Sequence, residues 1–447
     1  MKIHVAFGRQ GLSLELPDGP RYHVVKVHSA PPLPDVEKAL GAALDTPVAG
    51  PPLMELAKGK KSAAISVCDI TRPAPNPITL PPLLDRLHRA GIAPENVTLC
   101  IATGLHRGAT EDELRTILGA KIAAAYTVVN HDARDRERHR FVGTTKQGTP
   151  IYIDERFMSA ELHLTLGFIE QHLMLGFSGG RKLVAPGLAG QETIKVLHSP
   201  QFMREARATE GSICDNPLHA ELLEVARMAR HDFMLDVTLT KTREISGVFA
   251  GEPVAAHAAG VEFLQGSSIE YLPEYVDAVI TTAAGYPLDL TFYQTIKGVT
   301  AVQHILKPGG KILVLSECAE GVGSAEFATM MRGYRGPRAF LDAIEHTPVQ
   351  VDQWQLEKLA MVGLKHDVLL YAPGIPSKNL GALGANCFAS VEAAVAGLLR
   401  GMPEHARVAV IPDGPYACAR VKESAASPGV CDDAKADPCV AKTNPAI

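Results

Sequence analysis

The sequence predicts an α/β protein of two domains, each with a mostly parallel sheet flanked by helices. At 447 residues the chain is too long for one typical hydrophobic core. Apolar segments of strand length alternate with segments of helical periodicity, which is the pattern of parallel β-α-β units. This alternation restarts near residue 268. We therefore expect an N-terminal domain over 1–267, a C-terminal Rossmann-like α/β domain over 268–423, and a polar, cysteine-containing tail over 424–447.

The first domain is expected to begin with short strands and to continue as alternating strands and helices. A Gly-rich turn and a Pro-Asp-Gly turn divide residues 2–28 into three strands, a pattern typical of a meander. The apolar strand that follows from residue 60 should end by Pro73, because proline lacks an amide hydrogen and fixes its own φ. The other predicted elements of this domain are helices at 36–44, 81–90, 220–228 and 253–263, and strands at 96–104, 149–154, 161–170 and 234–240.

The second domain repeats the alternation of strands and helices. A Lys-Pro-Gly-Gly sequence separates a predicted helix at 294–306 from the strand that follows it, and Gly and Pro are typical turn residues. The predicted strands of this domain are 275–285, 311–317, 366–374 and 407–415, and its further helices are 338–345, 352–359 and 391–399.

Composition argues against several classes of protein. The net charge of −5 includes no basic block, so nucleic acid is not an expected partner. The N-terminus lacks the apolar core of a signal peptide, and no apolar run is long enough to cross a bilayer, so we expect no membrane partner and a cytoplasmic protein. The eight cysteines show no C-x-x-C spacing, so a structural zinc site is not expected, and the pairing of Cys431 with Cys439 stays undecided.

Polar side chains follow two of the predicted strands in the first domain. Asp69 and Arg72 follow one strand, and His106 and Arg107 follow the next. Ligands of open parallel sheets collect at the carboxyl ends of the strands, so we expect these side chains to share a site. A histidine in a loop at such an edge is more often functional than one in a core.

A second group of candidate residues lies between 172 and 198. GFSGGRKL is similar to a phosphate-binding P-loop, but Arg181 replaces the required glycine and Leu183 replaces the hydroxyl residue that binds magnesium. Gly179 and Gly180 still permit a backbone that presents amides to an anion, and an ordinary tight turn is the alternative. Three further candidates lie here, namely Lys182 in the turn, His172 before it and His198 after it. Each has a structural alternative: Lys182 could belong to an ordinary tight turn, His172 could be a hydrogen-bonded core residue, and His198 could lie at a helix C-terminus.

A third group, Tyr293, Gln294 and Lys297, lies at a predicted helix start in the second domain. Tyr293 and Lys297 are four residues apart and share a helical face. A lysine and an amide near a helix start suit a carboxylate, whereas a solvated first turn is the alternative.

These groups together suggest stereochemical inversion at a carbon beside a carboxylate. Two histidines could act as acid and base on mirror-image substrates, and cationic side chains could bind the carboxylate. Removing a proton from that carbon is difficult, because the carbanion would form beside an anion. For a 2-hydroxy acid, the histidines could instead deprotonate the hydroxyl while an electrophilic cofactor accepts the α-hydrogen as hydride.

The combined motifs resemble the lactate racemase family. They are D-x-T-R-P at 69–73, G-L-H-R at 104–107, H-x5-S-G-G-R-K at 172–182, His198, and Y-Q-x-x-K at 293–297. The resemblance spans nearly the whole chain to about residue 420. It implies a racemase or epimerase that interconverts D- and L-2-hydroxy acids, such as lactate, by transient hydride transfer to a nickel-pincer nucleotide. This cofactor is a pyridinium-3-thioamide-5-thiocarboxylic acid mononucleotide that holds nickel.

The resemblance also implies roles for individual residues. The N-terminal domain would bind the cofactor, in the interdomain cleft, and maturation enzymes would supply it. His106 and His172 would be the acid/base pair, Lys182 the covalent attachment point, and His198 the nickel ligand. Planar four-coordination of nickel(II) fits such a pincer. The residues implied to contact the cofactor are Ser178, Gly179, Gly180, Asp69 and Tyr293, and those implied to contact the substrate are Arg72, Gln294, Lys297 and Trp354.

Two alternatives stay open at this point. An NAD-dependent 2-hydroxy acid dehydrogenase is disfavoured because the G-x-G-x-x-G fingerprint is absent from the sequence. A nickel- or cofactor-binding protein without turnover belongs to a different class. The sequence does not decide which 2-hydroxy acid is the substrate, the oligomeric state, or the role of the tail.

Overall fold

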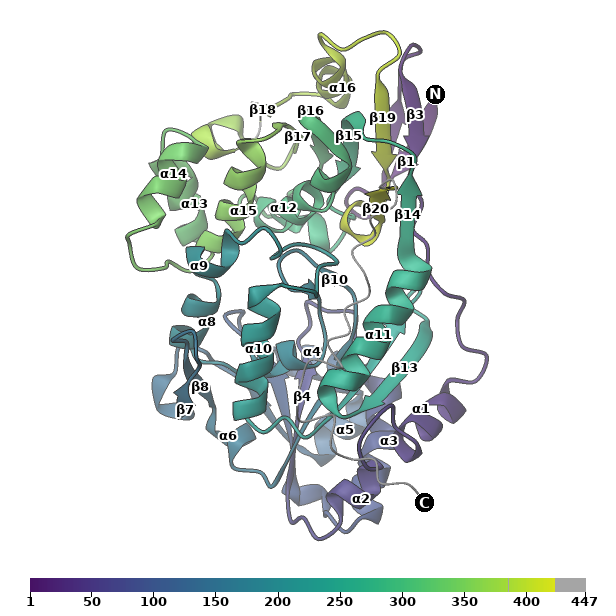
Figure 1. Ribbon diagram of the computed structural model, residues 1–447, viewed down its shortest axis with the longest axis vertical. Helices are drawn as coiled ribbons and strands as arrows, with labels where there is room; N and C mark the ends of the chain where they lie inside the picture. The colour runs from purple at the N-terminus through teal and green to yellow at the C-terminus, as the bar shows by residue number, and fades with distance from the viewer. Residues whose placement is uncertain (385, 423–447) are drawn as a thin grey trace. The chain divides into compact units, whose positions relative to one another are not determined.

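The computed structural model describes residues 1–384 and 386–422, which fall into two compact units (Figure 1). We call residues 29–197 and 205–267 the N-terminal unit. Residues 1–28, 198–204 and 268–422 form the C-terminal unit. Both units are mixed α/β structures with mainly parallel sheets flanked by helices, as the sequence predicts. Among the described residues, no helix is long and apolar enough to cross a membrane.

The N-terminal unit is built on a six-stranded sheet with the order β13-β12-β9-β4-β5-β6. All neighbours are parallel except β12 and β13, which are antiparallel. Every residue of the central strands β4 and β9 is buried, as expected for a parallel sheet covered on both faces. The strands are β4 (Ala63–Cys68), β5 (Val97–Ala102), β6 (Thr127–Asn130), β9 (Leu162–Phe168), β12 (Phe233–Leu239) and β13 (Ile245–Gly251).

Helices and two small hairpins complete the N-terminal unit. α4 begins at a capping box in which Thr110 and Glu113 exchange side-chain and backbone hydrogen bonds. The hairpins pair β7 (His139–Thr144) with β8 (Pro150–Asp154) and β10 (Gln171–His172) with β11 (Gly176–Phe177). The helices are α1 (Val36–Asp45), α2 (Leu53–Ala57), α3 (Asn76–Arg89), α4 (Glu111–Leu118), α5 (Ala120–Ala125), α6 (Glu155–Met158), α7 (Arg181–Val184), α8 (Gln191–Leu197), α10 (Pro217–Met228) and α11 (Pro253–Ser268).

The C-terminal unit contains a second six-stranded sheet, wholly parallel, with the order β18-β17-β16-β15-β19-β3. Its strands are β3 (Arg21–Val24), β15 (Val276–Thr282), β16 (Leu306–Leu315), β17 (Asp367–Tyr371), β18 (Asn386–Cys387) and β19 (Arg407–Ile411). Two further pairs are β1 (Lys2–Val5) with β2 (Leu12–Glu15) and β14 (Ile269–Leu272) with β20 (Cys418–Val421). Its helices are α9 (Pro200–Met203), α12 (Phe292–Thr300), α13 (Ala325–Gly333), α14 (Pro337–Ile344), α15 (Gln353–Gly363) and α16 (Val391–Leu399).

Three details differ from the sequence expectations. The meander over 2–28 is wrong for its third strand, because β3 pairs in parallel with β19 and not with β2. Residues 1–28 therefore lie in the C-terminal unit, although the domain prediction places them in the first domain. The helix predicted at 294–306 ends at Thr300, and the predicted Lys-Pro-Gly-Gly turn lies within β16. The tail over 424–447, with Cys431 and Cys439, lies outside the described residues.

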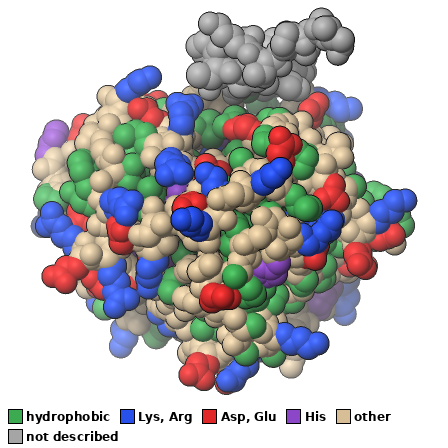
Figure 2. All heavy atoms as spheres, turned by 90° about the horizontal axis from the view of Figure 1, so that it is seen from below, with side chains coloured by type: hydrophobic (Ala, Val, Ile, Leu, Met, Phe, Trp, Pro, Cys, Tyr) green, Lys and Arg blue, Asp and Glu red, His purple; other side chains and the backbone are tan. Residues whose placement is uncertain are grey.

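Charges of both signs are interspersed on the surface. Figure 2 shows one face of the molecule, on which Lys and Arg side chains lie among Asp and Glu side chains. No large area of one sign is visible on that face.

Candidate active site

Asp69 and His106 form a hydrogen-bonded pair in the N-terminal unit. They follow β4 and β5, which are parallel neighbours, so the loops after both strands meet at one edge of the sheet. His106 Nδ1 lies 2.7 Å from Asp69 Oδ2. The other oxygen, Oδ1, accepts hydrogen bonds from the Thr71 hydroxyl at 2.6 Å and the Thr71 amide at 3.2 Å. Asp69 is buried, whereas the His106 side chain is 43% exposed and therefore accessible to a ligand.

The electrostatics of this pair fix the roles of the two histidine nitrogens. Burial of Asp69 opposes its ionisation, but the hydrogen bond and charge of His106 and the charge of Arg72 outweigh it and lower the pKa of Asp69. An ionised carboxylate only accepts hydrogen bonds, so His106 Nδ1 must donate. In the neutral ring, Nε2 then carries the lone pair that a general base needs.

His172 shows the opposite arrangement at the end of β10. Its Nδ1 accepts hydrogen bonds from the backbone amides of Met174, at 3.5 Å, and Leu175, at 3.3 Å. An accepting Nδ1 leaves the proton of the neutral ring on Nε2. The two candidate acid/base histidines are therefore held in complementary tautomers.

The glycine turn after β11 is held by contacts within the N-terminal unit. The Ser178 hydroxyl accepts a hydrogen bond from the Glu170 amide, at 3.0 Å, and donates one to the Phe168 carbonyl, at 3.1 Å. Gly179 has φ +85° and a Cβ there would collide with Asp236, so this turn requires glycine. The amide of Gly180 donates to Asp236 Oδ2 at 2.7 Å. The Ser178 hydroxyl and the Gly180 amide are thus already engaged by protein groups.

Lys182 lies half-buried in the first turn of α7, near the strand-end residues. The buried thiol of Cys68 shows this proximity, because several charged groups act on it. Burial and the charges of Asp236 and Asp69 raise the pKa of Cys68 to about 12, against the opposing cations of Arg72 and Lys182. The structure therefore brings Asp69, Arg72 and Lys182 together around the end of β4.

The remaining predicted residues lie in the C-terminal unit. The His198 ring packs on the Trp354 ring with centroids 4.5 Å apart. Trp354 Nε1 donates to the Tyr293 hydroxyl at 3.1 Å, and Gln355 Nε2 donates to the Tyr293 carbonyl at 3.0 Å. These contacts fix the ring of His198 relative to the start of α12.

Gln294 and Lys297 lie in the first two turns of α12. The Thr291 hydroxyl caps this helix by accepting a hydrogen bond from the backbone amide of Gln294 at 3.5 Å. The side-chain oxygen of Gln294 is buried and has no hydrogen-bond partner in the described part of the chain. Because buried polar atoms are normally paired, this amide is a group that a ligand or a water would complete.

Sequence reasoning assigned no role to Arg181, Asp236 and His257, which lie beneath the glycine turn. Arg181 donates to three backbone carbonyls of the turn segment, and Asp236 binds the Gly180 amide. His257 Nε2 lies 2.8 Å from the Ser178 carbonyl. An aspartate in the middle of an otherwise apolar strand, MLDVTLT, was the available signal for Asp236.

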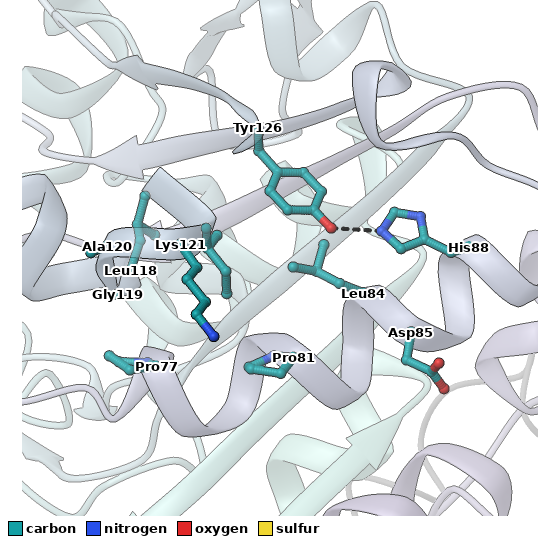
Figure 3. Close-up of a pocket in the computed structure, with 11 residues that line it drawn as sticks. Pro77, Pro81, Leu84, Asp85, His88, Leu118, Gly119, Ala120, Lys121 and Tyr126 are labelled. Carbon is teal, nitrogen blue, oxygen red and sulfur yellow. Dashed lines mark hydrogen bonds between the residues drawn. The ribbon is translucent and has the colours of Figure 1, made fainter. Parts of the chain in front are cut away.

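A pocket of about 570 Å³ elsewhere in the N-terminal unit contains none of the predicted residues (Figure 3). It lies beside α3 and α5 and includes Pro81, His88, Lys121 and Tyr126. His88 Nδ1 contacts the Ile92 carbonyl at 2.8 Å, and the Tyr126 hydroxyl lies 2.6 Å from His88 Nε2. Both ring nitrogens of His88 are thus used in structural hydrogen bonds.

Within the described residues, no group of three or more His, Cys, Asp and Glu side chains forms a metal site.

Comparisons with known proteins agree over most of the chain. Residues 7–211 match the family model of the lactate racemase N-terminal domain, and residues 273–417 match that of the lactate racemase C-terminal domain. The lactate racemase of Thermoanaerobacterium thermosaccharolyticum is 34% identical over 377 residues, which cover 82% of this chain and 87% of the relative. The lactate racemase of Lactiplantibacillus plantarum is 33% identical over 383 residues, which cover 85% of this chain and 89% of the relative.

Solved structures extend the comparison to the fold. The lactate racemase apoprotein of T. thermosaccharolyticum matches with a TM-score of 0.84 at 30% identity, covering 94% of this chain and 100% of the other. A protein from Thermotoga maritima matches with a TM-score of 0.66 at 19% identity, covering 89% and 100%. The second likeness concerns the fold alone.

Proposed function

This chain belongs to the lactate racemase family, and from that premise we propose that it interconverts the D and L enantiomers of lactate or a related short 2-hydroxy acid. The observation that carries the proposal is the Asp69–His106 pair, an accessible base beside a buried carboxylate, close to Arg72 and Lys182. A second histidine, His172, is held in the complementary tautomer. Racemisation calls for two acid/base groups, because each enantiomer presents its hydroxyl to a different side of the site.

The residues present fit a nickel-pincer nucleotide. Lys182 offers a half-buried amine next to a turn that only glycine can form. His198 offers an imidazole that packs against Trp354, which suits a metal bound through one protein nitrogen and the donors of the cofactor itself. When bound, this group would accept the α-hydrogen of the substrate as hydride and return it to either face.

The chain itself would bind the substrate and move its hydroxyl proton. Arg72, Lys297 and the side-chain NH2 group of Gln294 would hold the carboxylate. The buried, unpaired oxygen of Gln294 is an acceptor and would need a donor, such as a hydroxyl or a water. His106 Nε2 would take the hydroxyl proton from one enantiomer, and His172 would serve the other through the ring nitrogen that carries its lone pair. Asp69 would act through His106, by holding Nδ1 as the donor, and this differs from the sequence expectation that it contacts the cofactor.

For the other residues expected to contact the cofactor, we propose a structural role. Ser178, Gly179 and Gly180 would shape the turn that presents Lys182, since the Ser178 hydroxyl and the Gly180 amide are used within the protein. Tyr293 would support the pocket through its hydrogen bond with Trp354.

A chiral assay tests the proposed activity directly. The protein is produced together with cofactor-maturation enzymes and offered single enantiomers of lactate, 2-hydroxybutyrate and malate. We expect the opposite enantiomer to appear, one nickel per chain, and a mass adduct on Lys182. An active protein with unmodified Lys182 would contradict the covalent link. Net 2-keto acid formation with added NAD would instead support a dehydrogenase, and nickel binding without exchange of α-deuterium would support a carrier.

The two bases can be separated by following one half of the reaction. In His106→Asn, racemisation should stop, but one enantiomer should still yield bound 2-keto acid within a single turnover. In His172→Asn, the other enantiomer should do so. His198→Ala should instead lower nickel content. Loss of both half-reactions in each base variant, with nickel and adduct intact, would exclude the division of labour between the histidines.

A further inference from the structure

Arg181 is a buried cation that binds the backbone on which two proposed site residues depend. Arg181 is only 2% exposed. Nη2 donates to the carbonyls of Leu175, at 3.2 Å, and Phe177, at 3.1 Å, and Nη1 donates to the carbonyl of Gly179, at 3.4 Å. Nη1 also lies 2.8 Å from His257 Nε2. One guanidinium thus gathers three alternate carbonyls of the segment 175–179.

We propose that Arg181 is a positioning residue that holds Lys182 and His172 in a fixed arrangement through this segment. The inference rests on the proposed function, which gives these two residues their roles. Arg181 is adjacent to Lys182 in the chain, and both belong to the first turn of α7. Its side chain therefore anchors the backbone that carries the proposed attachment point.

The connection to His172 runs through Leu175. The Leu175 carbonyl accepts from Arg181, and the Leu175 amide donates to His172 Nδ1. The ring nitrogen that sets the tautomer of His172 is therefore bound to a residue that Arg181 holds. Loosening of Leu175 would weaken the shorter of the two amide contacts that position the His172 ring.

Only a guanidinium matches this set of acceptors. Its planar fork presents several donors in fixed directions, whereas a lysine ammonium is a point charge on a flexible stem. The position is costly, because no ion pair joins Arg181 to a carboxylate among the described residues, and burial lowers its pKa to about 9. Asp236, the nearby carboxyl, binds the Gly180 amide. Burying a charge costs free energy and seldom stabilises a fold. We therefore infer that Arg181 serves to position the backbone of residues 175–179.

His257 supports the same segment from α11. Its Nε2 lies 2.8 Å from both Arg181 Nη1 and the Ser178 carbonyl. Burial and the charge of Arg181 hold the pKa of His257 well below its usual range, so the ring is neutral and adds no second cation. The guanidinium remains the cation around which the segment is organised.

The test compares Arg181→Met and Arg181→Lys with a control, Arg86→Met. Arg86 is also mostly buried in the N-terminal unit, and it binds Asp45 and the Pro82 carbonyl, away from the segment 175–179. Amide hydrogen exchange is measured in protein without cofactor. Exchange of residues 174–180 should rise about tenfold or more in both Arg181 variants and stay unchanged in the control.

A second measurement follows the consequence for the proposed chemistry. The modified fraction of Lys182 is determined by mass spectrometry after production with maturation enzymes, and turnover is expressed per modified chain. Arg181→Met should lower the modified fraction, and turnover per modified chain should fall about 10²-fold, because small misplacements of reacting groups cost that much. Arg181→Lys should lie between this variant and the wild type.

The outcomes separate this inference from the proposed function. Unchanged exchange, modification and turnover in a folded Arg181→Met protein would overturn the positioning role. If Arg181→Met does not fold, Arg181→Lys decides, because it keeps the charge but cannot reach three carbonyls. An unmodified Lys182 in the wild type would refute the proposed cofactor link while the exchange data still report whether Arg181 orders the segment.

Discussion

Single residues in the N-terminal unit set the protonation states on which the proposed reaction depends. Asp69 is the clearest case, because its Oδ2 receives His106 Nδ1 at 2.7 Å while Thr71 satisfies Oδ1. Both carboxylate oxygens are therefore occupied. This leaves the carboxylate one way to orient His106, with Nε2 as the base.

Replacing Asp69 with asparagine should reduce turnover without removing the cofactor. An amide can donate to Nδ1 as well as accept from it, so the ring would also populate the tautomer with a protonated Nε2. We expect kcat to fall about 10²- to 10⁴-fold, the range associated with a general base. Chiral assays measure the loss, and the mass adduct at Lys182 should be unchanged. Thr71→Val is the control, since it removes the hydroxyl bond to Oδ1 and the long 3.4 Å bond from Arg72 Nη1 but leaves the Asp69 carboxylate in place, and it should cost about tenfold or less.

Asp236 should make stability depend on pH. Burial raises the pKa of Asp236 to about 7, although the Gly180 and Gly167 amides and the charge of Arg181 oppose this rise. The folded protein then holds a proton that the unfolded chain releases above about pH 4, so the free energy of unfolding falls as pH rises from about 4 to about 7. Asp236→Asn removes this loss.

Urea unfolding of the protein without cofactor measures the effect. Relative to the wild type, Asp236→Asn should be more stable at about pH 8 than at about pH 5 by a few kcal/mol, at about 1.4 kcal/mol per pKa unit. A stability difference that is equal at the two pH values would show that the carboxyl does not titrate in this window.

The residue-level predictions succeeded best where a strand end carried a polar side chain. Asp69 and His106 could be placed together because parallel neighbours end at the same edge. Arg181 and Asp236 could not, because their partners are backbone groups of a loop whose path depends on the folded unit. A local sequence pattern does not specify which carbonyls a buried side chain will meet.

At the level of elements, the short helix α9 is tied to α14 and α15 within the C-terminal unit. Arg204 Nε donates to Glu357 Oε1 at 2.8 Å and Nη1 approaches Glu345 at 3.3 Å. Lys358 Nζ donates to the Met203 carbonyl at 2.7 Å. Since His198 lies two residues before α9 and its ring contacts Trp354 of α15, these contacts stabilise the surroundings of the proposed nickel ligand.

Arg204→Met should destabilise this connection, because Glu357 is fully buried and would lose its cation. We expect a loss of about 3 kcal/mol in urea unfolding, the scale of a broken buried ion pair. Burial raises the pKa of Glu357, so protonation should lessen the loss at acid pH. The double variant Arg204→Met with Glu357→Gln should recover part of the stability. If it is no more stable than Arg204→Met alone, the ion pair is not the cause.

Element boundaries were predictable where local chemistry decides them. The capping box at Thr110 and Glu113 marks the start of α4, and such a box is a local pattern of side chains. The helix expected to reach residue 306 ends at Thr300, because Gln303–Ile305 forms a 3-10 turn and β16 then pairs from Leu306. Pairing with β15 skips residues 307–310, where the register shifts and Gly309 has φ +74°, so the Pro-Gly-Gly preference for a turn persists as an irregularity inside β16.

At the scale of the whole molecule, the chain's first strands belong to the C-terminal unit. β3 pairs in parallel with β19, with Arg21 opposite Arg407 and Val24 opposite Val410. The composition of residues 2–28 predicts strands but contains no signal for a partner so distant in sequence. The boundary near residue 268 can be predicted from the neighbouring sequence. The unit to which residues 1–28 belong depends on which distant strand they pair with.

Val25→Ala should therefore weaken the C-terminal unit and spare the N-terminal unit. Val25 is 1% exposed, its amide donates to the Val410 carbonyl, and it packs in a core cluster with Leu272 and Val276. Removing two methyl groups from a packed core should cost on the order of 2 kcal/mol. Amide hydrogen exchange should rise in β15 and β19 but not in β4 and β9. Val67→Ala, in the buried strand β4, is the matched control and should show the reverse pattern. Faster exchange in β4 and β9 alone after Val25→Ala would contradict the assignment of the N-terminal strands to the C-terminal unit, because a lost core contact weakens first the unit in which it is made.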